Sequence, residues 1–234
     1  MEVGTFKNRV PFGIAELDNL IEGGLPAGGL IIVAGNAGAG KTILSAQFIY
    51  NGAVLYKEKG VYVCLSESRQ HFKDNMLGLG WDFAKLEEKN LVKIVELPTV
   101  AKIRVEDMTD LIVEEAKRFK AQRIVVDSIS ALNLALGSKA EVRAVVNLLT
   151  RMLKNIGCTA LMITESPWGS KGIGMGIEEF IADGIIIMES IVVGNRLDRR
   201  LMILKMRATS HDTRYYRLNI AKETGIMLSL YPEM

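Results

Sequence analysis

Cysteine, histidine and tryptophan are scarce in this chain, with two of each among 234 residues. Cys64 and Cys158 lie in apolar segments, and neither has a second cysteine or a histidine at metal-ligand spacing. This pattern excludes a disulfide scaffold and a zinc site, so we interpret both residues as buried core thiols in a reducing compartment.

Hydrophobic runs long enough for a membrane are also missing. The longest apolar run has about five residues, whereas a helix that spans a bilayer needs about 20. The first residues contain Lys7 and Arg9 but no apolar core of a secretion signal. We therefore expect a cytoplasmic protein that has no membrane partner.

Neither sign of charge dominates. Lys and Arg number 29 against 27 Asp and Glu, a net charge of +2, which excludes a histone-like or acidic-tail protein. The apolar fraction of 49% is typical of a soluble globular domain. No repeat, low-complexity tract or proline-rich linker divides the chain, and we expect residues 1–234 to form a single domain.

Short apolar segments alternate with amphipathic ones along the chain. Strands are predicted over 30–34, 61–65, 91–95, 124–126, 159–164 and 184–188, and helices over 41–50, 69–77, 107–120 and 141–155. This alternation predicts βαβ crossovers and a parallel sheet. Further strands are predicted over 199–207, 214–220 and 226–230, joined by turn residues, which indicates an antiparallel extension of the sheet.

Basic residues gather in these late strands. From Arg196 to Arg217 there are seven Lys or Arg against two Asp. Such a cluster is typical either of a surface for an anionic partner or of solvated strand faces. The composition leaves both interpretations open.

A glycine-rich loop joins the first predicted strand to the first predicted helix and matches the pattern G-x-x-x-x-G-K-[ST]. We assign nucleotide binding to its residues and to the next residue of the helix: Gly35, Asn36, Ala37, Gly38, Ala39, Gly40, Lys41, Thr42 and Ile43. Backbone N–H groups of such a loop converge on phosphate oxygens, and the lysine reaches the β- and γ-phosphates. The hydroxyl of Thr42 is placed to bind Mg²⁺. Strand, loop and helix together favour a phosphate site over a simple glycine-rich turn.

Two carboxylates are predicted at the same edge of the sheet as this loop. Asp127 ends the strand at 124–126, where a Walker B acid holds the metal ion; taken alone, it also fits a turn residue or a helix cap. Glu67 follows the strand at 61–65, a suitable place for the base that activates water. A helix-capping role fits Glu67 equally well on local grounds.

Several motifs together resemble the single-domain KaiC-like branch of the RecA and RadA ATPases. They are residues 12–18, 23–28, the glycine-rich loop, 47–52, 60–63, the strand ending at Asp127, and 176–183. The resemblance implies an α/β fold with a RecA-like P-loop ATPase core, in which a mostly parallel, twisted sheet is flanked by helices and has a C-terminal antiparallel extension. It also implies ATP and Mg²⁺ as cofactors, with Thr42 and Asp127 at the metal ion.

The resemblance assigns catalytic roles to three residues. It supports Glu67 as the catalytic glutamate, although many relatives carry two adjacent glutamates where this chain has Ser66 and Glu67. Lys205 and Arg207 match a K-x-R motif whose cations reach the γ-phosphate bound by a neighbouring subunit, and strand alternation puts both on one face. This implies a homo-oligomer, either a hexameric ring or a filament, with nucleotide at the subunit interfaces. Two cations on a solvated strand face are the alternative.

The segment from Ser166 to Ile177 contains four glycines together with Trp168 and Lys171. In related rings the equivalent loop lines the pore and contacts single-stranded DNA, and an aromatic ring and a lysine offer stacking and charge for that contact. A plain connector explains the segment equally well. Glu165, just before it, is a candidate sensor of the γ-phosphate.

Two functions follow from these observations. The first is a Mg²⁺-dependent ATPase that acts with DNA in recombination or repair. The second is an ATP-gated signalling or assembly module that turns ATP over slowly or not at all. The enzyme is favoured by Lys41, Asp127, Glu67 and the pair Lys205 and Arg207. Ser66 and the near-neutral net charge favour the module.

Overall fold

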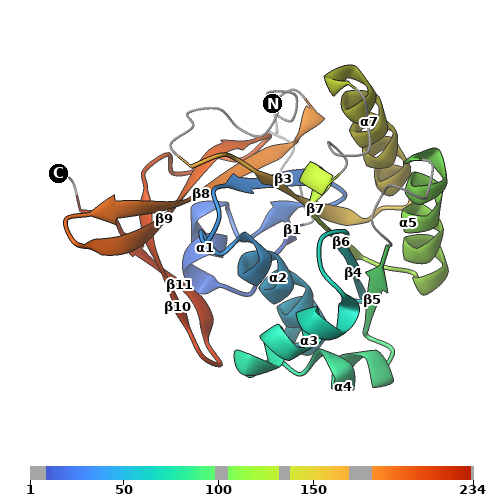
Figure 1. Cartoon of the computed structure of the whole chain (residues 1–234), viewed down its shortest axis with the longest axis horizontal. Coiled ribbons are helices and arrows are strands. Elements are labelled where there is room, and N and C mark those ends of the chain that lie inside the picture. The colour runs from blue at the N-terminus through green and yellow to red at the C-terminus, as the bar shows by residue number, and fades with distance from the viewer. Residues whose placement is uncertain (1–8, 98–104, 132–137, 169–180, 233–234) are drawn as a thin grey trace, which may run out of the picture.

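Nine strands form one continuous sheet in the computed structural model of this chain (Figure 1). The structure describes residues 9–97, 105–131, 138–168 and 181–232. The strand order is β11-β10-β9-β8-β3-β7-β6-β4-β5. The strands are β3 (Leu30–Gly35), β4 (Gly60–Cys64), β5 (Val92–Glu96), β6 (Arg123–Asp127), β7 (Thr159–Glu165), β8 (Gly184–Val193), β9 (Arg196–Met206), β10 (Tyr216–Ala221) and β11 (Gly225–Leu230).

The parallel half of the sheet extends from β8 to β5. Its strands are continuous apolar runs because helices cover both faces. One face carries α2 (Lys41–Leu55), α3 (Arg69–Gly78) and α4 (Phe83–Glu88), and the other carries α5 (Val105–Phe119) and α7 (Lys139–Asn155). The parallel sheet with flanking helices, predicted from the alternating pattern, is confirmed.

The antiparallel half begins where β8 extends past the end of β3 and turns back into β9 through Gly194 and Asn195. β9 pairs antiparallel with β10, and β10 with β11. The predicted antiparallel extension is therefore confirmed. The predicted bounds of β8 and β9 were too short at their shared hairpin, because the pairing of these two strands continues to Val193 and Arg196. β9 also ends at Met206, so Arg207 lies just after the strand and not in it.

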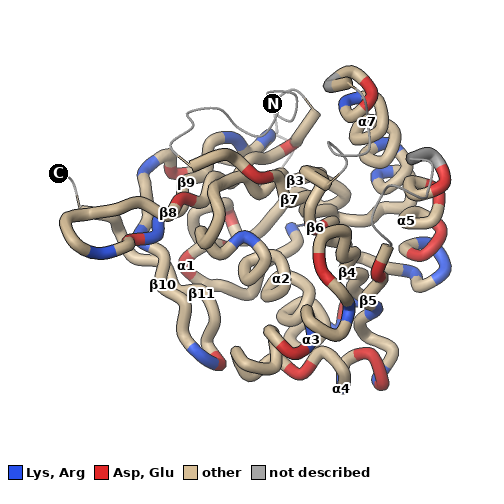
Figure 2. The backbone as a smooth tube through the Cα atoms, in the orientation of Figure 1, with Lys and Arg blue, Asp and Glu red and all other residues tan. Residues whose placement is uncertain are grey.

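Basic residues of the late strands are paired with acids. Arg196 and Arg217 each lie 3.1 Å from Asp198, and Arg200 lies 2.7 Å from Glu189. Figure 2 shows both signs of charge along β8 and β9. Five of the seven basic residues thus form an ion pair within the chain, so the cluster does not by itself indicate an anionic partner.

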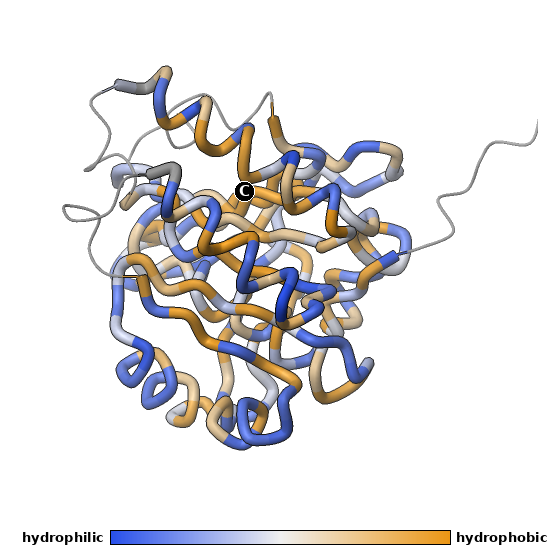
Figure 3. The backbone as a smooth tube through the Cα atoms, turned by 90° about the vertical axis from the view of Figure 1, so that its right-hand side faces the viewer, coloured by the Kyte–Doolittle hydropathy of each residue, from blue (hydrophilic) through white to orange (hydrophobic). Residues whose placement is uncertain are grey.

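Two hydrophobic cores lie on the two faces of the sheet. Along β3, Ile31 and Val33 face the core beneath α2, while Leu30, Ile32 and Ala34 face the core beneath α5 and α7. Figure 3 shows interior strands as predominantly hydrophobic. Full burial of a Leu, Ile or Val side chain stabilises the fold by about 1.5–3 kcal/mol. β3, from which the glycine-rich loop emerges, is therefore fixed from both sides.

Side chains cap several helices at their first turns. Ser68, Asp82 and Ser138 accept a backbone hydrogen bond at the starts of α3, α4 and α7. Elements that the sequence did not predict are α4, α1 (Ala15–Leu20), β1 (Arg9–Val10), β2 (Leu25–Pro26) and the 3₁₀ turn η2 (Ile129–Ala131). They are too short for a clear periodicity. No helix in the described residues has the length and apolar character needed to cross a membrane.

Candidate active site

The carboxyl ends of the parallel strands meet at one edge of the sheet. Gly35 at the end of β3 is paired with Glu165 of β7 and Met188 of β8, and Cys64 at the end of β4 is paired with Asp127 of β6. The loops after these strands therefore leave the sheet side by side, where open α/β sheets bind their ligands.

The glycine-rich loop connects β3 to α2 at this edge. Gly40, directly before the helix, has a φ of +98°, a conformation that other residues rarely adopt. Lys41 is buried, and its Nζ donates a hydrogen bond to the carbonyl oxygen of Asn36 at 2.8 Å. Burial lowers the pKa of Lys41, whereas the charges of Glu165 and Asp127 raise it. The loop thus encloses an ammonium group at the N-terminus of a long helix.

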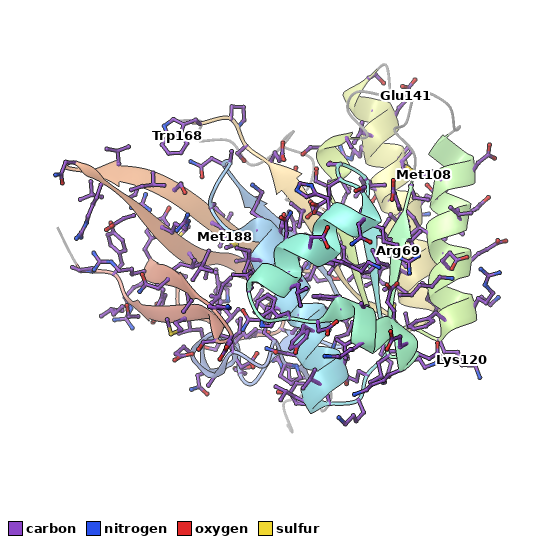
Figure 4. All side chains as sticks on the ribbon, turned by 60° about the horizontal axis from the view of Figure 1, so that its bottom comes forward. Arg69, Met108, Lys120, Glu141, Trp168 and Met188 are labelled. Atoms are coloured by element: carbon purple, nitrogen blue, oxygen red, sulfur yellow. The ribbon has the colours of Figure 1, made fainter. Side chains whose placement is uncertain are left out.

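Contacts with β8 hold the loop in place. The side chain of Asn36 exchanges two hydrogen bonds with the backbone of Ser190, each 2.8 Å long. A Cβ atom at Gly35 would lie 1.8 Å from the carbonyl oxygen of Met188, so the approach of the two strands requires glycine. Figure 4 shows Met188 in the interior, beside this loop. Contacts within the chain therefore fix the start of the loop.

Thr42, Tyr62 and Asp127 form a hydrogen-bonded cluster. The hydroxyls of Thr42 and Tyr62 both donate to Oδ2 of Asp127, each at 2.8 Å. Burial raises the pKa of Asp127, and these two hydrogen bonds lower it. Tyr62 is fully buried, with its ring centroid 4.2 Å from that of Phe72. The cluster holds a hydroxyl and a carboxylate together, and such oxygen atoms are ligands that Mg²⁺ prefers.

Glu67 lies between β4 and α3, at the same edge of the sheet as the glycine-rich loop. Its side chain is 24% exposed, with His71 Nδ1 3.6 Å from its carboxylate and an Asn75 hydrogen bond of 3.5 Å. Burial, and then the charge of Asp127, raise the pKa of Glu67, while His71 and Asn75 lower it. Ser68 is the N-cap residue of α3, so Glu67, which directly precedes it, does not cap the helix with its side chain.

Glu165 and the start of the following segment also lie beside the loop. The backbone N–H of Ser166 donates to the carbonyl oxygen of Gly35 at 3.0 Å. The carboxylate of Glu165 raises the pKa of the loop lysine. Trp168 is 57% exposed, and Figure 4 shows it at the periphery of the molecule. Residues 169–177, the rest of the candidate DNA segment, lie outside the described residues.

Lys205 and Arg207 lie toward the opposite edge of the sheet. Met206 pairs with Gly184, which pairs with Ile31 near the start of β3. The stretch of β3 from there to the loop is about 13 Å long, and the two strand spacings between β3 and β9 add about 10 Å sideways. This separation exceeds the length of a Lys or Arg side chain. The structure therefore does not bring these cations to the glycine-rich loop of their own chain.

The groups at the carboxyl edge fit a nucleotide with Mg²⁺. The N-terminus of α2 and the buried ammonium of Lys41 are donors for phosphate oxygens. Thr42 and Asp127 supply oxygen ligands for a hard divalent cation.

A lysine-bearing phosphate loop after the central strand of a mostly parallel sheet defines a class of protein, the P-loop ATPase domains of the RecA superfamily. A family model described as "ATPase: KaiC" matches residues 10–231. The chain belongs to this KaiC-like family of ATPase domains, and the resemblance of its motifs is confirmed.

Individual relatives match nearly the whole chain. UPF0273 protein PH0284 of Pyrococcus horikoshii is 34% identical over 96% of this chain and 94% of its own length. The circadian clock oscillator protein KaiC of Synechococcus elongatus is 33% identical over 88% of this chain but only 41% of its own length. The crystal structure of KaiC-like protein PH0186 from Pyrococcus horikoshii OT3 has a TM-score of 0.86 at 37% identity, covering 96% of this chain and 99% of that one.

Two groups at the site were missed from the sequence. Tyr62 reaches Asp127 because β4 and β6 are neighbours, and Arg199 of β9 donates through Nε to the carbonyl oxygen of Gly38 at 2.7 Å. The signal for Tyr62 was a polar hydroxyl inside an otherwise apolar strand. Arg199 had no signal beyond its place in the basic cluster.

Proposed function

We propose that this protein hydrolyses ATP with Mg²⁺ at a site that two copies of the chain complete together. One observation carries the proposal: the phosphate loop and Asp127 lie at one edge of the sheet, while Lys205 and Arg207 lie toward the other. A role for these cations in hydrolysis therefore requires the loop of a neighbouring copy.

Phosphate binding is assigned to the loop from Gly35 to Thr42. Its backbone N–H groups and Lys41 would hold the phosphates, and Thr42 and Asp127 would hold Mg²⁺, which neutralises phosphate charge when bound. Tyr62 fixes the orientation of the Asp127 carboxylate through its hydrogen bond. Glu165 lies close enough to affect Lys41 electrostatically, which supports its proposed role as a γ-phosphate sensor.

Proton transfer is assigned to Glu67. A general base works best when its pKa is near the operating pH. Burial raises the pKa of Glu67 and so moves it toward neutral pH. Because Ser66 replaces the first of the family's two glutamates, Glu67 is the carboxylate that this position retains. We propose that it accepts the proton of the attacking water.

Charge stabilisation is assigned to Lys205 and Arg207 of the neighbouring copy. A positioned arginine stabilises the charge that develops on the transferred phosphoryl group. Contacts of this kind join unlike surfaces of two copies, so they generate rings or filaments. The proposed assembly is therefore a homo-oligomer with nucleotide at its interfaces.

Two outputs of the ATPase are proposed. Exposed Trp168, three residues after the end of β7, supports contact with single-stranded DNA, as in recombination or repair, because bases stack on such rings. Ser66 and relatives named as circadian clock oscillator proteins support an ATP-gated assembly module with slow turnover.

Phosphate release from Mg-ATP by the purified protein tests the function, with metal-free buffer and Lys41→Ala as controls. Adding single-stranded DNA at two salt concentrations separates the outputs. Stimulation that weakens with salt supports the DNA-coupled enzyme. Slow turnover that single-stranded DNA does not change, together with assembly that depends on ATP, supports the module. Turnover that persists without a divalent metal or with Lys41→Ala would contradict the proposed site.

A further inference from the structure

Arg9 of β1 lies across the segment that follows β9, 200 residues later in the chain. Its Nη1 donates to Oγ1 of Thr209 at 2.7 Å, and its Nη2 donates to the carbonyl oxygen of Ala208 at 3.1 Å. The same guanidinium group donates to the carbonyl oxygen of Gly24 at 3.3 Å and to Oε2 of Glu22 at 2.6 Å. A planar guanidinium with four partners fixes the relative position of the two segments.

Glu22 contacts the same segment through its other carboxylate oxygen. Oε1 of Glu22 accepts a hydrogen bond from the backbone N–H of Ser210 at 3.1 Å. Glu22 and Ala208 have φ values of 55° and 52°, in the left-handed region that non-glycine residues rarely occupy. Such conformations persist where the surrounding contacts determine them. The two turns are therefore held by their contact with each other.

The beginning of this segment is anchored to the sheet. The backbone N–H of Arg207 donates to the carbonyl oxygen of Asp183 at 2.7 Å, and its guanidinium lies 3.4 Å from the Asp183 carboxylate. Asp183 also accepts from the backbone N–H of Leu30 at 2.9 Å and pairs with Lys154 at 2.6 Å. The Arg207 side chain nevertheless remains 56% exposed. A rigid backbone thus presents an exposed cation.

From these contacts we propose that Arg9 and Glu22 are positioning residues, which hold the segment 207–210 so that Arg207 reaches the nucleotide of a neighbouring copy. This inference rests on the shared site described under the proposed function. Misplacing a reacting group by about 1 Å can cost about 100-fold in rate. We therefore expect a loss of turnover with little change in ATP affinity, because the phosphate loop lies at the other edge of the sheet.

Arg9→Met and Glu22→Gln test the inference. Arg9→Met keeps an unbranched stem and removes all four hydrogen bonds, and Glu22→Gln keeps the side-chain shape if the first variant fails to fold. Arg118→Met is the matched control, because Arg118 also pairs with a glutamate, Glu115, but lies on α5. Turnover, ATP affinity and thermal stability are measured for each. The kcat of Arg9→Met should be about 10- to 100-fold below that of the wild type. Arg118→Met should keep the wild-type kcat.

Mixed oligomers distinguish positioning from general stability. Arg9→Met mixed with Lys41→Ala should recover activity, because some interfaces then join an intact loop to an intact Arg207 segment. Arg9→Met mixed with Arg207→Ala should not recover, because every Arg207 segment in the mixture is defective. The reference mixture of Arg207→Ala with Lys41→Ala reports on the shared site itself.

The outcomes separate the two proposals. If the reference mixture does not recover, the shared site is wrong and the positioning role falls with it. If the reference recovers, then wild-type kcat in both Arg9→Met and Glu22→Gln overturns the positioning role alone. Recovery of Arg9→Met by Arg207→Ala also overturns it. Selective recovery by Lys41→Ala supports it.

Discussion

The parallel and antiparallel halves of the sheet use their strand ends differently. In the parallel half every carboxyl end points to one edge, so residues 35–42, Glu67 and Asp127 gather there despite their distance in sequence. In the antiparallel half the chain reverses at each strand, and β9 returns Lys205 and Arg207 toward the opposite edge. A parallel sheet thus concentrates a site within one chain, whereas the added antiparallel strand carries residues away from that site, where we propose that another copy uses them.

Arg207→Ala changes the antiparallel half only and should have the largest effect on turnover. Removing an arginine that stabilises transition-state charge is expected to lower kcat by about 10³- to 10⁵-fold. ATP affinity should stay near the wild-type value, because the loop that binds phosphate is intact. Steady-state kinetics with a nucleotide titration checks both numbers. A normal kcat would contradict the proposal that Arg207, from the antiparallel half, acts at the ATP site formed by the parallel half of another copy.

Glu67→Gln changes the parallel half and should nearly stop hydrolysis. The amide keeps the shape of the carboxylate but cannot accept a proton from water, so kcat should fall by about 10²- to 10⁴-fold with ATP binding intact. Glu88→Gln, an exposed substitution on α4, is the matched control. If Glu67→Gln turns over like the wild type, the base lies elsewhere.

Lys41→Ala should weaken binding where the other two variants do not. Loss of one charge-assisted hydrogen-bond donor to phosphate is expected to reduce ATP affinity by about 10- to 100-fold. Fluorescent-nucleotide titration measures the change, with circular dichroism to verify the fold. An unchanged dissociation constant would remove the assignment of the phosphate loop.

His71→Gln should have the smallest effect, a change in the pH dependence of turnover. Glu67 must be ionised to act as a base, so activity falls as the pH falls through its pKa. His71 lowers the pKa of Glu67, so its removal should move the acid limb of the kcat profile to higher pH. A shift to lower pH would contradict this. The residual activity of Glu67→Gln should lack this limb.

The parallel half could be predicted from the sequence in more detail than the antiparallel half. Strand, glycine loop and helix are contiguous between Leu30 and Leu55, so one local pattern contains the phosphate loop and its setting. The boundaries of β8 and β9 at their shared hairpin were less accurate, because burial there does not follow polarity: Ser190 is buried whereas Val192 is exposed.

Contacts between distant segments were not predictable in either half. The hydrogen bond from Tyr62 to Asp127 depends on β4 lying next to β6. The hydrophobic periodicity of individual strands does not determine their order in the sheet. The contact of Arg9 with Thr209 depends on a two-residue strand, β1, which has no pattern of its own. Such contacts form only in the tertiary structure and have no local sequence pattern.

Turnover per chain as a function of protein concentration is the most direct test of whether one copy supplies Arg207 to the site of another. The shared site predicts that turnover rises with concentration and levels off where light scattering shows that oligomers have formed. Constant turnover by a chain that stays monomeric at every concentration would contradict it, and would leave Lys205 and Arg207 as ordinary surface cations.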